Sequence, residues 1–213
     1  MFSDIREEIT RNFLELKMWL QDIPEGLASD FAPTSNGLFF VYLYGIYEEI
    51  VRNVIITTVA ELNNANVKID KCSYELYSVI FSPDYDALYG VGSEHKWEKR
   101  WAISRKLSDN SVINIPADIF PTDGKNIRYR QLESIAKSFG MKENILPRPE
   151  IGGYLQEMVN NRNHIAHGNK LPREVGCRYT KADLLQRCEM ISEVCNYIVD
   201  VYEKYITQKQ FLR

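Results

Sequence analysis

The sequence has 213 residues, of which 45 % are hydrophobic, enough for one large domain with a well-formed core. The net charge is −3, which excludes a generic basic protein that binds nucleic acid through its overall charge but not one with a local basic cleft. The most apolar run, residues 38–47, has ten residues against the roughly 20 of a membrane span, and the first residues lack a signal peptide's apolar core. We therefore expect a cytoplasmic protein without a membrane partner.

The four cysteines form neither a disulfide framework nor a metal site in the sequence pattern. None belongs to a Cys-x-x-Cys pair, and Cys188 and Cys195 are seven residues apart, on one stripe of a helix. We interpret these two as small core residues in a reducing compartment.

The first predicted helix spans residues 4–20, where hydrophobic residues recur at steps of three and four and Ser3 can cap the start. Pro24 and Gly26 end it, and residues 28–37 read as a loop.

The second predicted helix spans residues 38–62. Its first half is apolar on every side, which is typical of a helix at the centre of a bundle. The β-branched run at residues 54–59 would also suit a strand. We favour a helix because no turn residue interrupts the pattern.

Further helices follow beyond residue 62, separated by polar or Gly- and Pro-rich segments. They are expected at residues 74–81, 94–107, 127–139, 151–166 and, after a capping box at Thr180–Asp183, 184–205, with loops at 63–71, 83–92, 108–126 and 171–179. The sequence thus predicts an all-α fold, a single domain over residues 1–213. We expect an antiparallel helical bundle with a mostly helical or irregular insertion at about residues 65–126.

The helix expected at residues 94–107 carries five cations, two acids and two tryptophans. Trp97 and Trp101 are one turn apart. We favour an amphipathic helix with both indoles inward and a solvated basic side. The alternative is an RNA-contacting face on which the indoles stack with bases.

Polar chemistry concentrates at residues 161–168, Asn-Arg-Asn-His-Ile-Ala-His-Gly, which hold two of the three histidines. On a regular helix, five residues turn by roughly 140° beyond one full turn, so Arg162 and His167 converge only if the helix ends near Ala166. Gly168 suits such an end.

Arginine and histidine together can carry out one specific reaction. Arg162 offers a fork of donors for a phosphate, and His167 at a helix C-terminus can serve as a general acid or base. The pair is sufficient for transesterification at an RNA phosphodiester, in which the 2′-hydroxyl is the nucleophile, without a metal or other cofactor. A basic residue followed by glycine is also ordinary helix termination.

The motif Arg162-Asn163-x-x-x-His167 resembles the Arg-x4–6-His signature of the HEPN superfamily (higher eukaryotes and prokaryotes nucleotide-binding). Residues 45–50 are similar to the aromatic–Glu centre of its second core helix. Residues 126–140 are similar to the helix before the motif in stand-alone prokaryotic members of the ribonuclease-like branch. The resemblance covers about residues 36–62 and 126–206.

This resemblance implies a metal-independent endoribonuclease that acts as a homodimer, with two motifs facing one composite active site. Members are often toxins or phage-defence effectors, held in check by an antitoxin or other regulatory partner. It implies that Arg162 binds the scissile phosphate, His167 is the acid/base, Asn163 orients them, and Glu48 lies near the site. Glu48 can instead pair with Arg52 on its own helix.

Several alternatives stay open. Lys125, Arg128 and Arg130 form a basic group that can flank the cleft and bind RNA. His164 has no role in the signature; metal binding by His164 and His167 lacks further ligands, so packing or capping is expected. The chain can also be a non-catalytic module that binds nucleotide or protein and dimerises. In a third reading, a hydroxyl of Tyr129 or Tyr179 is modified by a partner transferase.

Overall fold

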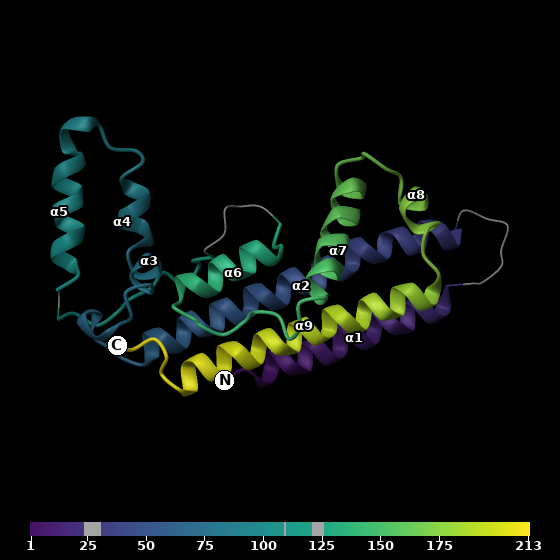
Figure 1. Cartoon of the computed structure of the whole chain (residues 1–213), viewed down its shortest axis with the longest axis horizontal. Helices are drawn as coiled ribbons and strands as arrows, with labels where there is room; N and C mark the ends of the chain where they lie inside the picture. Colours follow the sequence, from purple (N-terminus) through teal and green to yellow (C-terminus); the bar gives the residue numbers. More distant parts are fainter. Residues whose placement is uncertain (24–30, 109, 121–125) are drawn as a thin grey trace.

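The computed structural model describes residues 1–23, 31–108, 110–120 and 126–213, and these residues form helices with two isolated β-bridges (Figure 1). The body consists of α1 (Ser3–Asp22), α2 (Phe31–Asn64) and α9 (Lys181–Thr207), with α6 (Tyr129–Ser138), α7 (Ile151–Ala166) and α8 (Pro172–Gly176) against it. Between α2 and α6 lie η1 (Ile69–Lys71), α3 (Tyr77–Ile80), α4 (Ser82–Ala87), η2 (Ser93–His95) and α5 (Lys96–Lys106). The all-α prediction is confirmed. None of the helices in these ranges is long and apolar enough to cross a membrane.

Helix α2 runs through the middle of the molecule for roughly 50 Å, given a rise of about 1.5 Å per residue. It contacts α1, α7, α8 and α9, which explains why its apolar residues occur on all sides. The β-branched run at residues 54–59 is helical, as predicted. Cys188 and Cys195 on α9 are fully buried, which confirms them as core residues.

Helix α2 begins earlier than predicted, because residues 31–37 are helical rather than loop; residues 28–30 lie outside the described residues. Pro33 is tolerated in the first turn, where its missing N–H has no helical partner to lose. Gly37 is needed where α2 meets α8, since a Cβ there would lie 2.0 Å from the Pro172 carbonyl oxygen. A Cβ on Gly176 would lie 1.9 Å from the Pro33 carbonyl oxygen. Gly37 and Gly176 therefore allow α2 and α8 to cross closely, and they do not form a turn.

Two further predicted loops contain short helices, and in both cases a proline occupies the first turn. These are α4, which overlaps the loop expected at residues 83–92, and α8, within that expected at 171–179. In α8 the Glu174 carboxylate accepts a hydrogen bond from the Leu171 N–H at 2.6 Å and so caps the helix start. The predicted Ser3 cap is also wrong: Phe2 is the N-cap of α1, and the Ser3 hydroxyl donates to Asp4.

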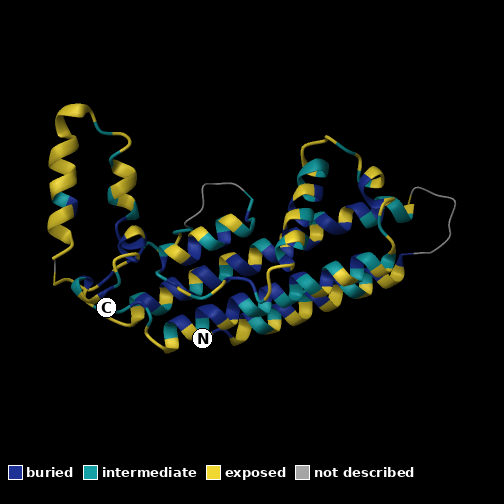
Figure 2. Ribbon diagram, viewed as in Figure 1, coloured by how far each residue is buried: buried dark blue, intermediate teal, exposed yellow. Residues whose placement is uncertain are grey.

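Residues 82–106, which comprise α4, η2 and α5, form an arm that projects from one end of the bundle (Figure 1). Figure 2 shows that its surface is almost entirely exposed; Ile103 is the one buried residue of α5. At its base the chain segments pair through the Lys68–Val112 bridge, and Asn63 exchanges two hydrogen bonds with Ile115. The arm lies within residues 65–126; that this segment is an insertion into a single domain stays a prediction.

The tryptophans of the arm do not face inward. Trp97 is 72 % exposed and Trp101 51 % exposed, so the favoured expectation of an amphipathic helix with buried indoles is wrong. The reason is that α5 packs against little besides η2 and α4, so most of its surface faces solvent.

Candidate functional site

The motif helix α7 ends where the sequence predicts. His167 is the C-cap, and its N–H still donates to the Asn163 carbonyl oxygen at 3.0 Å. Gly168 adopts a φ of +69°, a left-handed conformation that glycine adopts without strain. The Lys170 N–H then donates to the His164 carbonyl oxygen at 3.0 Å, which satisfies the last turn. His167 therefore stands at an exposed helix terminus.

The Arg162 side chain is held in place from three directions. Its Nη1 donates to Asn126 Oδ1 and to Asn163 Oδ1, each at 3.1 Å. Its guanidinium lies over the Tyr44 ring, 4.8 Å from the ring centre. Within the described part of the chain, Nη2 and Nε have no hydrogen-bond partner. The arginine is thus oriented by one nitrogen and keeps the other two donors of its fork for a ligand.

Tyr44 joins this arginine to Glu48, and sequence reasoning missed it. Its hydroxyl donates to Glu48 Oε1 at 3.0 Å and accepts from the Ile127 N–H at 3.1 Å. Burial raises the pKa of Tyr44 to about 12, so the hydroxyl keeps its proton at physiological pH. The four-residue spacing between Tyr44 and Glu48 could have revealed the pair.

Tyr44 connects Glu48 to Arg162, because its hydroxyl donates to Glu48 and its ring lies beneath the guanidinium. A role for Glu48 in the site, which the family resemblance implies, stays a prediction. Arg52, the alternative partner of Glu48, has its guanidinium over the Phe120 ring, 4.9 Å from the ring centre. Asn163 contacts Arg162 directly.

His167 stands outside this network in the described residues. Because its N–H continues the helical hydrogen-bond pattern, its position on α7 is about 140° around the axis from Arg162. One chain thus presents the two residues on different faces of the end of α7.

His164 lies in a different place, beside an open hollow of about 420 Å³ whose lining includes Asn160, Asn161 and Arg178. Among the described residues, no group of three or more His, Cys, Asp or Glu side chains could hold a metal ion.

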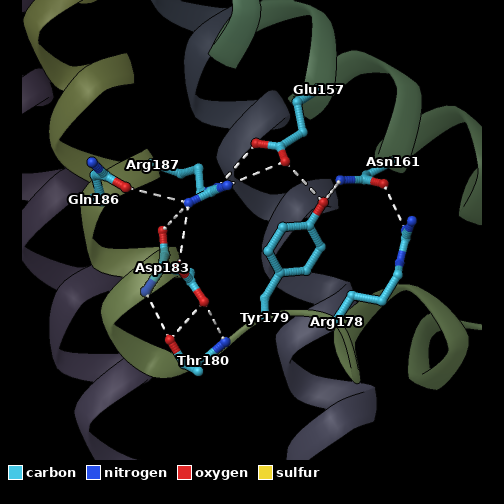
Figure 3. Close-up of polar contacts among 8 residues, drawn as sticks. All are labelled: Glu157, Asn161, Arg178, Tyr179, Thr180, Asp183, Gln186 and Arg187. Atoms are coloured by element: carbon cyan, nitrogen blue, oxygen red, sulfur yellow. Dashed lines mark hydrogen bonds and ion pairs between the residues drawn. The ribbon is translucent and has the colours of Figure 1, made fainter.

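A second network ties the motif helix to the bundle, as Figure 3 shows. Asn161 accepts a hydrogen bond from Arg178 and donates to the Tyr179 hydroxyl, which donates to Glu157. Arg187 on α9 donates to both Glu157 oxygens, at 2.9 and 3.2 Å. This network anchors two successive turns of α7 to α9 and to the segment after α8.

Tyr179 is thereby fully engaged. Its hydroxyl both donates and accepts, its ring packs on Phe40 at 4.8 Å, and burial raises its pKa. This argues against Tyr179 as a modified hydroxyl. Tyr129, the other candidate, is half-buried at the start of α6.

The predicted RNA-binding cations differ in their placement. Arg128 donates to Asn160 Oδ1 on α7 at 2.9 Å, so it lies beside the motif helix. Arg130 is exposed in the first turn of α6. Lys125 lies outside the described residues.

Comparison with known proteins identifies a family. The family model described as RiboL-PSP-HEPN matches residues 7–204, which includes the arm as well as the motif. Searches of curated proteins and of solved structures found no match.

Proposed function

Because the chain belongs to the RiboL-PSP-HEPN family, within the HEPN superfamily, we propose that it is a metal-independent endoribonuclease. The observation that carries this proposal is the state of Arg162. A half-buried arginine, fixed by two asparagines and a tyrosine ring and with Nη2 and Nε still available, is preorganised for a phosphate.

In the proposed reaction the 2′-hydroxyl of RNA attacks the adjacent phosphorus. A bond forms between the 2′-oxygen and phosphorus, and the bond from phosphorus to the 5′-oxygen breaks, leaving a 2′,3′-cyclic phosphate and a 5′-hydroxyl. His167 takes the proton from the 2′-hydroxyl or gives one to the leaving oxygen. Arg162 neutralises the charge that develops on the phosphate, and Asn163 holds its guanidinium.

We propose a homodimer with a composite active site. The placement of Arg162 and His167 on different faces of α7 supports this, because a second copy can bring its histidine to the open face of the first copy's arginine. Arg128, beside Asn160, would contribute positive charge along the same helix for the RNA backbone.

The test of catalysis compares four proteins on mixed single-stranded RNA in EDTA: wild type, Arg162→Ala, His167→Ala and His164→Ala. His164→Ala is the matched control, because it removes an imidazole from the same helix that has no assigned role. We expect wild type and the control to cleave, and the other two to lose roughly 10²-fold or more. Equal cleavage by wild type and His167→Ala would contradict the proposal.

The shared site has its own test. Arg162→Ala and His167→Ala, each inactive alone, are co-expressed so that mixed dimers form. If each site takes its arginine and histidine from different chains, every mixed dimer contains one intact site and cleavage returns in part. No recovery in mixed dimers would argue against the composite arrangement.

In the cell we propose a cytoplasmic toxin or phage-defence effector restrained by an antitoxin or regulator. Overexpression of wild type should slow growth, and His167→Ala should relieve it while His164→Ala does not. The competing proposal, a non-catalytic module that binds nucleotide or protein, predicts the same growth for all three.

A further inference from the structure

Exposed aromatic side chains are concentrated in the distal half of the arm. Tyr89 is 91 % exposed, and Trp97 and Trp101 are also largely open to solvent. Single exposed aromatics are common on protein surfaces, but three within thirteen residues of one projection are a cluster. Tyr89 follows α4, and Trp97 and Trp101 lie on α5, within the arm that projects from the bundle (Figure 1).

Tyr89 also lines a basic hollow between α4 and α5. The hollow measures about 320 Å³ and is lined by Tyr85, Leu88, Tyr89, Lys96 and Arg100. Among the described residues, its lining contains two cations and no acid. The Lys106–Asp84 ion pair, at 2.6 Å, joins the two helices below the hollow.

Both tryptophans are paired with arginines at the helical spacing of three or four residues. The guanidiniums of Arg100 and Arg105 lie 4.9 Å from the ring centres of Trp97 and Trp101. An arginine on one face of an indole leaves the ring's other face open. Arg100 also lines the hollow, so aromatic and cationic groups run without a break from Tyr89 to Trp97.

We infer that this surface binds single-stranded RNA, with bases stacked on the exposed rings and phosphates on Lys96 and Arg100. Open aromatic faces interleaved with cations are what single-strand binding requires, and stacking is sequence-tolerant because every base has a π-face. The charge of α5 favours a polyanion over a second copy of the chain, whose own α5 would bring five like charges to the contact.

This inference rests on the proposed function for its purpose, since it assigns the arm to substrate capture. In Figure 1 the arm and α7 project from the same side of the body, with α6 between them. An RNA strand held on the arm could therefore extend past α6 to the end of α7, where Arg162 and His167 lie.

The test measures binding by a signal that needs no cleavage. Trp19 is changed to phenylalanine, so that indole emission comes only from the arm, and His167→Ala prevents cutting. This full-length protein is titrated at low salt with single-stranded oligouridylate of about twelve nucleotides, within the span of known single-strand grooves. We expect quenching of the emission by RNA and by oligothymidylate, since stacking does not read the 2′-hydroxyl, and little quenching by a duplex.

The decisive comparison uses fluorescently labelled oligouridylate and its anisotropy. Trp97→Ala with Trp101→Ala should weaken binding at least about tenfold. Tyr74→Ala is the matched control, because Tyr74 is also exposed and stacked with an arginine, Arg213 at 4.3 Å, but lies outside the arm. It should bind like the parent.

Absence of quenching, or equal affinity of the double variant, would overturn the inference and leave the arm as a surface for an acidic protein. The experiments can contradict the proposed nuclease and the proposed binding site independently of each other. If wild type cuts no RNA but the arm still binds single strands, the proposed nuclease is wrong and the binding site stands. If the nuclease is active, the double variant should raise KM and leave kcat unchanged.

Discussion

Helices α7 and α5 each carry an arginine stacked on an aromatic ring, at nearly the same distance, yet the two rings differ in their exposure to solvent. Arg162 lies 4.8 Å from the centre of Tyr44, which is 1 % exposed, whereas Arg100 lies 4.9 Å from the centre of the exposed Trp97. In the first pair the ring is a fixed wall that orients the arginine. In the second pair both partners face solvent and can meet a ligand.

The difference originates in what surrounds each helix. α7 is anchored by Glu157 and Asn161 to side chains of α9 and of the segment after α8, while α5 packs mainly beside η2 and α4 among the described residues. A reaction that depends on ångström-scale positioning needs the first environment. Capture of a flexible strand needs the second, because open ring faces are the binding groups.

The largest expected effect is on the free energy of unfolding, which should respond strongly to a substitution in the bundle and weakly to one in the arm. Phe40→Ala removes a fully buried ring that packs on Tyr179, and should lower the free energy of unfolding by roughly 3–5 kcal/mol. Trp97→Ala should change it by no more than about 0.5 kcal/mol, because the indole is exposed. Urea denaturation followed by circular dichroism measures both. Similar losses would mean that the arm belongs to the cooperative core.

A second substitution acts on the crossing of α2 and α8, which holds the segment carrying Tyr179. Gly176→Ala would place a Cβ against the Pro33 and Gly37 backbone and should cost roughly 2–3 kcal/mol of unfolding free energy. Gly153→Ala is the control, since nothing lies within 4 Å of its Cβ position on α7. It should be neutral or stabilise by up to about 1 kcal/mol. A harmless Gly176→Ala would contradict the backbone contact.

Tyr44→Phe tests the role of the Tyr44 hydroxyl beneath Arg162. It keeps the ring but leaves the buried Ile127 N–H without its acceptor, which should cost about 1–2 kcal/mol in thermal or urea unfolding. Since residues 126–127 hold Arg162 through Asn126, RNA cleavage should also fall. Tyr89→Phe removes an exposed hydroxyl on the arm and should change neither quantity. If the two variants behave alike, the Tyr44 hydroxyl has no positioning role.

The smallest effect is expected at the start of α9, whose first turn lies next to Arg187. Hydrogen bonds from the Thr180 side chain and N–H lower the pKa of Asp183 from its ordinary 3.8. A carboxyl with a depressed folded-state pKa stabilises the fold above its ordinary pKa and ceases to do so as pH falls through the folded value. Asp183→Asn should therefore melt earlier than wild type at neutral pH, and the gap should shrink as the pH falls below the ordinary 3.8 of the carboxyl. A gap independent of pH would exclude the carboxylate as its cause.

Much of the motif region was predictable because its signals are local. The periodic apolar residues of 151–166 and the glycine at 168 predict the bounds of α7 correctly, and Thr180 caps α9 as expected. The partners of Arg162 were not predictable in the same way. Asn126 is 36 residues away in the sequence, and only the folded chain brings the two together.

The errors have a common physical origin. Spacing predicts which residues share a helix face, but not whether another element covers that face, so Trp97 and Trp101 were assigned to the interior. Residues 28–37 read as a loop in the sequence because proline and glycine, here Pro33 and Gly37, suit turns. Their actual use, a backbone-to-backbone crossing with α8, depends on a segment more than 130 residues later in the chain.

The order of elements along the chain has a consequence for biosynthesis. Helix α9 supplies Arg187, which fixes Glu157 on the motif helix, and it packs along both α1 and α2. A ribosome completes α7 before it has made α9, so the nascent motif helix lacks its anchor and α2 keeps one apolar side uncovered. The contact between Glu157 and Arg187 therefore forms only after α9 has emerged, so a growing chain holds its motif helix less firmly than the folded protein does.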